Sequence, residues 1–419
     1  MTPFLSFIYS VVLGILCVAP PEVIREPSNI SQMLGAAYPE FKTNYDIPLI
    51  VNSFLWMFLV VISSLLTFYT FTQKVHPALK ALFVYLLVVG CFFSQVPYIS
   101  FNAFMVATLT LYFYMALKKC DFKIIIDMLQ AVFWLELTFA GLHYFGKDVL
   151  MNFGKKDPVF FGTVFQHMRF SSLLCILSPF VLVRSKWYLI PICLSVILTA
   201  SSGFGLSIIA GVACYLALDY SRNTTHDLLL RDHLKRNYFW IFVLIILFIG
   251  IGMYQGRDSW AVALREGRLP IWLIIIKSWM FDTRINPFGT PDIFGISQSG
   301  PFSLKCFLFG HGLDTFYPMF PAYKADPNPF PQAHNDFFQF LWELGLAGSS
   351  ILAVFFGWLI KKLYDLRLHE EIAGCVIIAV NMFFHFPGRM TQTMWLLVGW
   401  VAFCETRIIF KENNPLTAR

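Results

Sequence analysis

The sequence predicts an all-α integral membrane protein, and two observations lead to this fold class. Of its 419 residues, 57% are hydrophobic and only 13% are charged, which is more apolar surface than a soluble domain of this length can bury. The apolar residues also form long continuous runs and not alternating ten-residue strands. Because hydrocarbon offers no partner to backbone polar groups, such runs are expected to be helices.

About twelve stretches approach the length of about 20 mostly apolar residues that a membrane-crossing helix needs, and some of them are short. They are residues 3–20, 48–72, 77–94, 97–117, 123–145, 169–183, 186–201, 203–219, 237–254, 337–360, 372–387 and 391–409. The first stretch has no basic flank before it, and Pro20 and Pro21 follow it directly. We therefore expect an uncleaved membrane helix there and not a removable signal.

Basic residues in the short loops predict the orientation. With both termini in the cytoplasm, every short basic turn falls on the cytoplasmic side except the one that holds Arg389. The formal charge of +6 is spread over these loops, which favours a membrane-facing basic rim over a nucleic-acid site. The nine cysteines are scattered and show no metal or redox spacing.

This topology divides the chain into three parts. Residues 1–254 hold helices one to nine, residues 255–335 form a long periplasmic loop, and residues 336–419 hold helices ten to twelve. The loop is rich in tryptophan and phenylalanine, so we expect it to fold over the outer membrane face. Its apolar stretch 271–281 is too short to span the membrane and is expected to lie at the interface.

A polar stripe is predicted where the loop enters the tenth helix. Several prolines precede His334, so the helix is expected to begin near it. Asn335, Gln339 and Glu343 then recur every four residues and share one helix face. The helix dipole disfavours imidazolium at this end, which keeps the His334 ring available as a base. The alternative is that His334 only caps the helix or sits in headgroup water.

Other polar residues lie on the same loop or inside an apolar helix. Arg268 opens the interfacial stretch, where its planar guanidinium could clamp a phosphate or meet lipid headgroups. Gly310 and Gly312 form a turn that would let a ligand approach the backbone. Glu136 interrupts an apolar helix, either for a functional reason or to hydrogen-bond a neighbouring helix.

The order of four sequence elements resembles that of the bacterial O-antigen ligase and O-antigen polymerase superfamily. The elements are residues 162–166; Gly267, Arg268 and Trp272; Gly310, Gly312 and Phe316; and His334, Asn335, Leu341, Glu343 and Gly345. The twelve-helix plan, with a large outer loop between helices nine and ten, is also similar to that family.

The resemblance implies a GT-C-like enzyme of the bacterial inner membrane. It would transfer a glycan from undecaprenyl diphosphate to an acceptor hydroxyl, such as a lipid A core sugar, at the periplasmic face. No metal or cofactor is implied, and the chain has no aspartate-x-aspartate pair. His334 would be the catalytic base and Arg268 the diphosphate clamp. Supporting roles are implied for Asn335, Gln339, Glu343, Gly310 and Gly312.

One position departs from the family pattern. Ser202 stands where the family commonly has an arginine, at the outer end of the seventh or eighth helix. Either the activity is altered, or Arg169 or Arg389 supplies the charge to the diphosphate.

Two other functions stay open from the sequence. A polymerase of repeat units, or a protein O-oligosaccharyltransferase, would use the same chemistry with another acceptor. A polysaccharide transporter or flippase would also have about twelve helices, but transporters place broken helices and charges at the midplane, often in repeated halves. The polar residues here crowd one outer loop, which favours the enzyme.

Overall fold

In a computed structural model, the part of the chain that can be described is helical. It comprises residues 4, 6–11, 75–89, 93–94, 97–145, 167–199, 201–223, 268–281, 302–316, 333, 335–385 and 391–414. Within these residues the only strand-like pairing is a single bridge between Phe281 and Phe302. The all-α fold class is thus confirmed for the described residues.

Each predicted stretch from 77–94 onward coincides with a described helix, apart from 237–254, which lies outside the described residues together with 48–72 and most of 3–20. The described helices also include one at residues 304–309 that the sequence did not predict. They are α4 (Pro77–Val88), α5 (Pro97–Leu117), α6 (Phe122–Tyr144), α7 (His167–Arg184), η4 (Lys186–Tyr188), α8 (Leu189–Thr199), α9 (Ser202–Asn223), α11 (Leu269–Met280), α12 (Leu304–Phe309), α14 (Asp336–Asp365), α15 (His369–Phe384) and α16 (Thr391–Asn413).

Three of the described helices are long and apolar enough to cross a membrane. They contain the candidate spans Phe122–Leu142, Asp336–Asp365 and Thr393–Asn413. Several other described helices are apolar but shorter, including Ile271–Met280 within α11. The full set of twelve spans, the periplasmic position of the loop, the orientation of the termini and the three-part division of the chain stay predictions.

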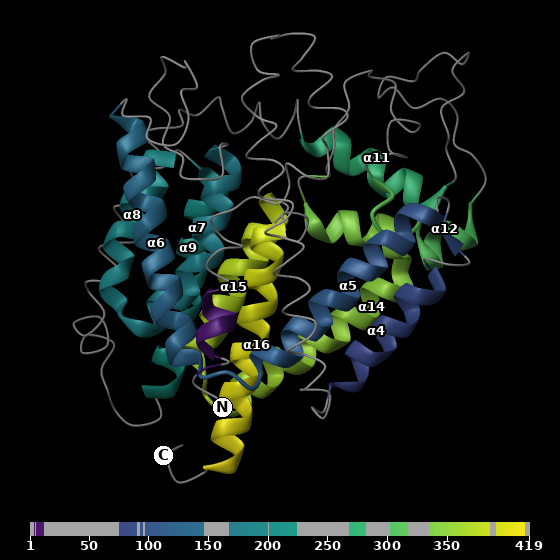
Figure 1. The fold of residues 1–419 in the computed structure, drawn as a ribbon. Coiled ribbons are helices and arrows are strands. Elements are labelled where there is room, and N and C mark those ends of the chain that lie inside the picture. The colour runs from purple at the N-terminus through teal and green to yellow at the C-terminus, as the bar shows by residue number, and fades with distance from the viewer. Residues whose placement is uncertain are drawn as a thin grey trace.

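The helices form two groups that meet at α15 and α16 (Figure 1). On one side stand α6, α7, α8 and α9, and on the other α4, α5 and α14 (Figure 1). The short helices α11 and α12 pack across the amino-terminal end of α14. Their packing there places residues of the predicted loop directly beside the predicted polar stripe.

Aromatic side chains fill the core between these groups. Phe113 of α5 meets Trp395 of α16 edge to face at 4.5 Å, and Phe180 of α7 meets Trp400 at 5.1 Å. Gly374 of α15 lets the helix approach, since a Cβ there would lie 2.1 Å from the Trp400 ring. These contacts hold α16 against both groups of helices.

A buried ion pair joins the end of α5 to α16. Lys118 Nζ lies 2.5 Å from Glu405 Oε2, and both side chains are about 5% exposed or less. Removing one partner of such a pair leaves an uncompensated buried charge, which costs about 3–5 kcal/mol. The pair therefore fixes the position of α16 relative to α5.

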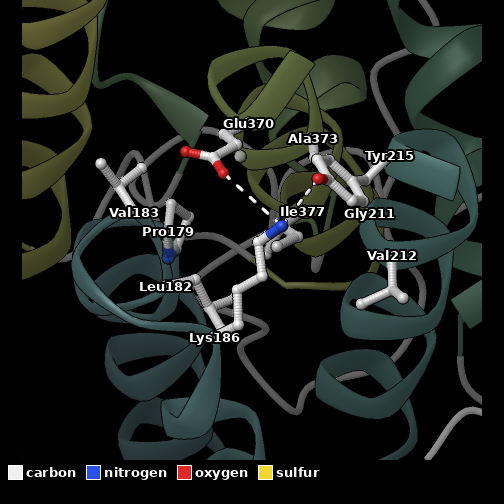
Figure 2. Close-up of a pocket in the computed structure, with 11 residues that line it drawn as sticks. Pro179, Leu182, Val183, Lys186, Gly211, Val212, Tyr215, Glu370, Ala373 and Ile377 are labelled. Atoms are coloured by element: carbon white, nitrogen blue, oxygen red, sulfur yellow. Dashed lines mark hydrogen bonds and ion pairs between the residues drawn. The ribbon is translucent and has the colours of Figure 1, made fainter. Parts of the chain in front are cut away.

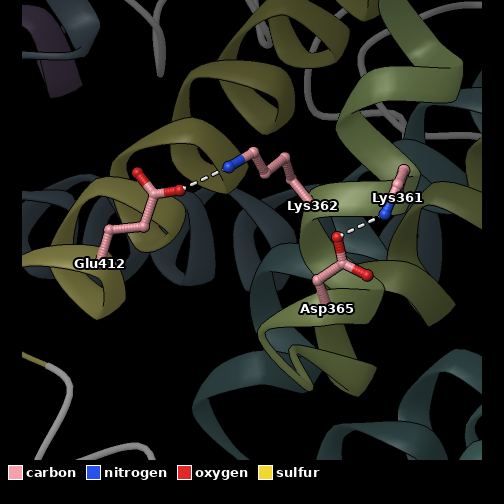
Figure 3. Close-up of polar contacts among 4 residues, drawn as sticks. All are labelled: Lys361, Lys362, Asp365 and Glu412. Atoms are coloured by element: carbon pink, nitrogen blue, oxygen red, sulfur yellow. Dashed lines mark hydrogen bonds and ion pairs between the residues drawn. The ribbon is translucent and has the colours of Figure 1, made fainter.

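The ion pairs at the far end of α14 are exposed by contrast. Lys361 binds Asp365 within the same helix, and Lys362 binds Glu412 of α16, each at 2.8 Å (Figure 3). Exposed pairs of this kind are screened by solvent and contribute little. They provide matched control positions for the buried polar groups of the candidate site.

Candidate functional site

The polar stripe begins with the cap of α14. Asn335 has extended backbone angles, and its Oδ1 accepts a hydrogen bond from the Phe338 amide at 3.1 Å. An asparagine side chain that satisfies an otherwise unpaired first-turn amide is a strong helix start. The predicted helix start near His334 is confirmed to within two residues, and His334 itself lies outside the described residues.

Two residues of the predicted stripe, Gln339 and Glu343, form a buried hydrogen-bonded chain with two backbone amides, whereas the Asn335 side chain caps the helix. Gln339 Oε1 accepts from the Ala333 amide at 3.3 Å, and Gln339 Nε2 donates to Glu343 Oε1 at 3.0 Å. The second carboxylate oxygen, Glu343 Oε2, accepts from the Asp314 amide at 2.9 Å. Both ends of this series of hydrogen bonds are backbone N–H donors. The Gln339 side chain must therefore turn its oxygen to Ala333 and its NH2 group to Glu343, and the Glu343 carboxylate must accept two hydrogen bonds.

Helix α14 is interrupted directly after this stripe, which the sequence reasoning did not predict. Gly345 has φ of 64°, in the left-handed region, so the carbonyls before it lose their helical donors. The amides of His311 and Gly312 donate to the carbonyls of Trp342 and Glu343, each at 3.0 Å. The break in α14 is thus capped by the turn at residues 310–314.

The glycines of this turn allow two backbones to meet. Gly310 has φ of 71°, and a Cβ there would lie 2.4 Å from the Glu343 carbonyl group. A Cβ on Gly345 would lie 2.4 Å from the Leu308 carbonyl oxygen. The close approach that these glycines permit in the structure is between α14 and the turn, and the predicted approach of a ligand stays a prediction.

His311 and Trp342 lock α11 to this assembly. The His311 ring stacks on Trp342 with centroids 4.1 Å apart, and its Nε2 lies 3.1 Å from the Ser278 carbonyl oxygen. Since a carbonyl can only accept, Nε2 carries a proton here. Trp342 Nε1 donates to Ser278 Oγ at 2.9 Å. His311 lies between the two glycines of the predicted turn, and the sequence predicted no role for it.

Trp272 connects α11 to Ala333, the residue that precedes His334 in the sequence. Its Nε1 donates to the Ala333 carbonyl at 3.1 Å, in a buried environment. Arg268 lies four residues earlier in helical backbone conformation, and therefore on the same face of α11. Partial burial lowers the pKa of Arg268, yet a guanidinium remains charged. The first turn of α11, which follows Arg268, is thus bonded to the residue that precedes His334.

The end of α15 joins the same region through residues that the sequence reasoning did not single out. The Phe383 ring meets Trp272 at 5.3 Å in an edge-on contact. Two residues later, buried His385 places Nε2 3.5 Å from Ser201 Oγ. A Cβ added at Gly203 would lie 2.5 Å from that same nitrogen. The imidazole of His385 therefore packs against the turn between α8 and α9.

The turn between α8 and α9 is also the place where the resemblance lacks its arginine. Ser202 begins α9, and the residues on either side of it contact His385. One turn before His385, Asn381 donates to Ser172 of α7 at 2.9 Å, which brings the start of α7 alongside. That start carries Arg169, whose side chain lies outside the described residues, as does Arg389. His385 falls inside the predicted apolar stretch 372–387, so no sequence signal marked it as a site residue.

The described residues were considered as metal ligands, and the chain was compared with known proteins. Among the described residues, no group of three or more His, Cys, Asp or Glu side chains is arranged to hold a metal ion. Comparison with protein-family models and with curated proteins found no match to this chain. A function for this chain therefore has to be inferred from the geometry of the site and from the family that its residues resemble.

Proposed function

We propose that this chain is a glycosyltransferase that resembles the O-antigen ligases and takes its glycan from undecaprenyl diphosphate. In the proposed reaction the oxygen of an acceptor hydroxyl attacks the anomeric carbon of the donor sugar, and His334 takes the hydroxyl proton. The bond between that carbon and the diphosphate oxygen breaks, and undecaprenyl diphosphate leaves with both bonding electrons. Arg268 stabilises the negative charge on the leaving diphosphate.

The observation that carries this proposal is the fixation of the chain on both sides of His334. Ala333 is held at its amide by Gln339 and at its carbonyl by Trp272, and Asn335 caps α14. A base must be positioned within hydrogen-bond reach of the proton it removes, and such positioning supplies much of the rate. The same clamp ties this segment to α11, which carries Arg268 one turn from Trp272.

His385 adds a third candidate for the charge that the resemblance assigns to the position of Ser202. The sequence offered Arg169 and Arg389 as candidates. His385 is a third, because its Nε2 lies beside Ser201 in the turn that holds Ser202. Transfer assays on Arg169→Ala, Arg389→Ala and His385→Ala separate them. The residue that supplies the charge should lower the rate when replaced, and wild-type rates in all three would remove the idea of compensation.

The proposal is tested by a reconstituted assay with lipid-linked oligosaccharide and candidate acceptors. His334→Gln should reduce transfer at least a hundredfold, the usual contribution of a general base. Arg268→Gln should reduce it because the diphosphate loses its clamp. His369→Gln removes the same side-chain type as His334→Gln elsewhere in the fold, and Lys361→Gln removes another cation; both variants should transfer normally. Full activity in purified, folded His334→Gln would refute the assignment of the base.

The acceptor distinguishes a ligase from a polymerase or a protein O-oligosaccharyltransferase. Deletion of the gene should remove all surface polymer if the chain is a ligase. Retention of glycan with a single repeat would instead favour a polymerase.

One structural observation favours the transporter alternative, namely the break in α14, because broken helices often form ion and substrate sites in transporters. In this chain, however, partners already occupy the carbonyls at the break. The carbonyls of Trp342 and Glu343 accept from the turn, and Tyr85 donates its hydroxyl to the Leu344 carbonyl. The break is therefore filled by the protein, which favours the enzyme.

A further inference from the structure

An apolar groove lies at the opposite end of α14 from the candidate site. It is formed where the end of α7, the middle of α9 and the start of α15 come together, and α15 begins four residues after α14 ends (Figure 2). Its apolar lining comes from Pro179, Leu182, Val183, Val212, Ala373 and Ile377.

Charged and polar groups gather at one end of this groove. Lys186 Nζ donates to the Tyr215 hydroxyl at 2.7 Å and lies 4.6 Å from the centre of that ring. The Glu370 carboxylate stands 3.9 Å from the same nitrogen (Figure 2). Lys186 and Glu370 are each between two-fifths and one-half exposed. The groove mouth thus presents one cation and one anion side by side, both within reach of a ligand.

Neighbouring aromatic residues indicate that this mouth lies at the membrane surface. Trp187 follows Lys186 directly and is 70% exposed, and Trp134 of α6 is 48% exposed. Trp134 Nε1 donates to the Tyr188 hydroxyl at 3.4 Å. Exposed tryptophan and tyrosine next to basic residues are typical of the interface between headgroups and hydrocarbon. The apolar lining then runs from headgroup depth into the hydrocarbon region.

The length of the apolar lining suits part of a lipid acyl chain. Along α7 the lining extends from Pro179 to Val183, which is about 6 Å at the helical rise per residue, and Lys186 lies just beyond the end of that helix. In a membrane the surrounding solvent is acyl chain, so an apolar groove open at this depth will be filled by one. What distinguishes the groove from ordinary lipid contact is the paired charge at its mouth.

We propose that this groove is a binding site for a zwitterionic phospholipid with a primary ammonium headgroup, that is, phosphatidylethanolamine. One acyl chain would occupy the apolar groove. The phosphate would lie at Lys186 and Tyr215, and the ammonium would donate to Glu370. Both charges of the headgroup then meet an opposite charge of the protein. The proposal does not depend on glycan transfer.

Phosphatidylcholine and phosphatidylglycerol provide the discriminating probes. The choline headgroup carries the same charge but no N–H donor, and the glycerol headgroup has no cation to offer Glu370. Native mass spectrometry of the purified full chain, titrated with the three lipids bearing identical acyl chains, should show about tenfold stronger retention of phosphatidylethanolamine. That factor corresponds to one charge-assisted hydrogen bond.

Variants assign each contact. Glu370→Gln should abolish the preference for phosphatidylethanolamine over phosphatidylcholine, and Lys186→Gln should weaken retention of all three lipids. Val183→Trp keeps every polar group and fills the groove, so it should weaken retention of all three even if the charge variants fold poorly. Glu412→Gln is the matched surface control and should retain lipid as the wild type does.

Three results would overturn the proposal. Equal retention of the three lipids by the wild type would mean ordinary annular lipid. A preference that survives Glu370→Gln would place the ammonium elsewhere. Undiminished retention by folded Val183→Trp would place the acyl chain outside the groove.

Discussion

Replacing Glu343 by glutamine should destabilise the protein although the two side chains have nearly the same shape. In the wild type, Glu343 accepts from Gln339 Nε2 and from the Asp314 amide, while Gln339 accepts from the Ala333 amide. A glutamine at position 343 can offer only one accepting oxygen. If Gln339 flips to compensate, its NH2 group faces the Ala333 amide, so a donor–donor contact arises in every arrangement.

The expected magnitude follows from the burial of these groups. Glu343 is 0% exposed and Gln339 is 3% exposed, so the displaced donor has no access to water. A buried polar group left without its partner costs about 1–3 kcal/mol. We expect Glu343→Gln to lose about 2 kcal/mol of stability, which should appear as a fall in the thermal unfolding midpoint of the purified protein.

The matched control is Glu412→Gln, which makes the same change in an exposed pair with Lys362 (Figure 3). Its midpoint should stay close to that of the wild type. The reverse change, Gln339→Glu, puts two carboxyls face to face and should be less stable than Glu343→Gln at neutral pH. Acidification should narrow its deficit, because one added proton restores the missing donor. Unchanged midpoints in Glu343→Gln and Gln339→Glu would show that the buried chain does not exist.

Three other predictions concern the break, the clamp and the buried ion pair. Gly345→Ala should lose about 1–3 kcal/mol, because its φ of 64° is strained for any residue with a Cβ, and thermal unfolding checks this. Trp272→Phe keeps the ring but removes the bond to Ala333; it should lower the rate of transfer up to about tenfold with little change in donor KM, and unchanged kcat would contradict the clamp. Lys118→Met and Glu405→Leu should each cost about 3–5 kcal/mol and the double variant much less, because it leaves no unpaired buried charge; additive losses in chemical denaturation would contradict this.

The sequence predicted those parts of the structure that are set by local patterns. Apolar runs located the helices, with α5 matching the expected stretch 97–117 at both ends. The four-residue spacing correctly placed Gln339 and Glu343 on one face, because helical geometry alone brings such residues together, whereas Asn335 lies before the helix and caps it. That Gln339 and Glu343 bond directly also follows from this spacing.

The features that the sequence did not predict depend on contacts between distant segments. The sequence around Gly345 has the apolar pattern of an uninterrupted helix. The break there is stabilised by the turn at residues 310–314 and by Tyr85, which is 259 residues from its partner Leu344. The roles of His311 and His385 likewise come from Trp342 and Ser201, which no periodicity connects to them. Hydrophobic patterning reports which face of a helix is buried, and it carries no information on which loop amide will fill a gap in that helix.

The ion pair between Lys118 and Glu405 has a consequence for biogenesis. The two residues are 287 positions apart, so during synthesis the lysine is made long before its carboxylate exists. Until the last helix arrives, the end of α5 must keep that ammonium in contact with water or headgroups. Pairing with Glu405 of α16 is then the event that allows the end of α5 to pack against α16. Chains that are truncated before residue 405 should accordingly be recognised as incomplete by membrane proteases, through a defect at α5.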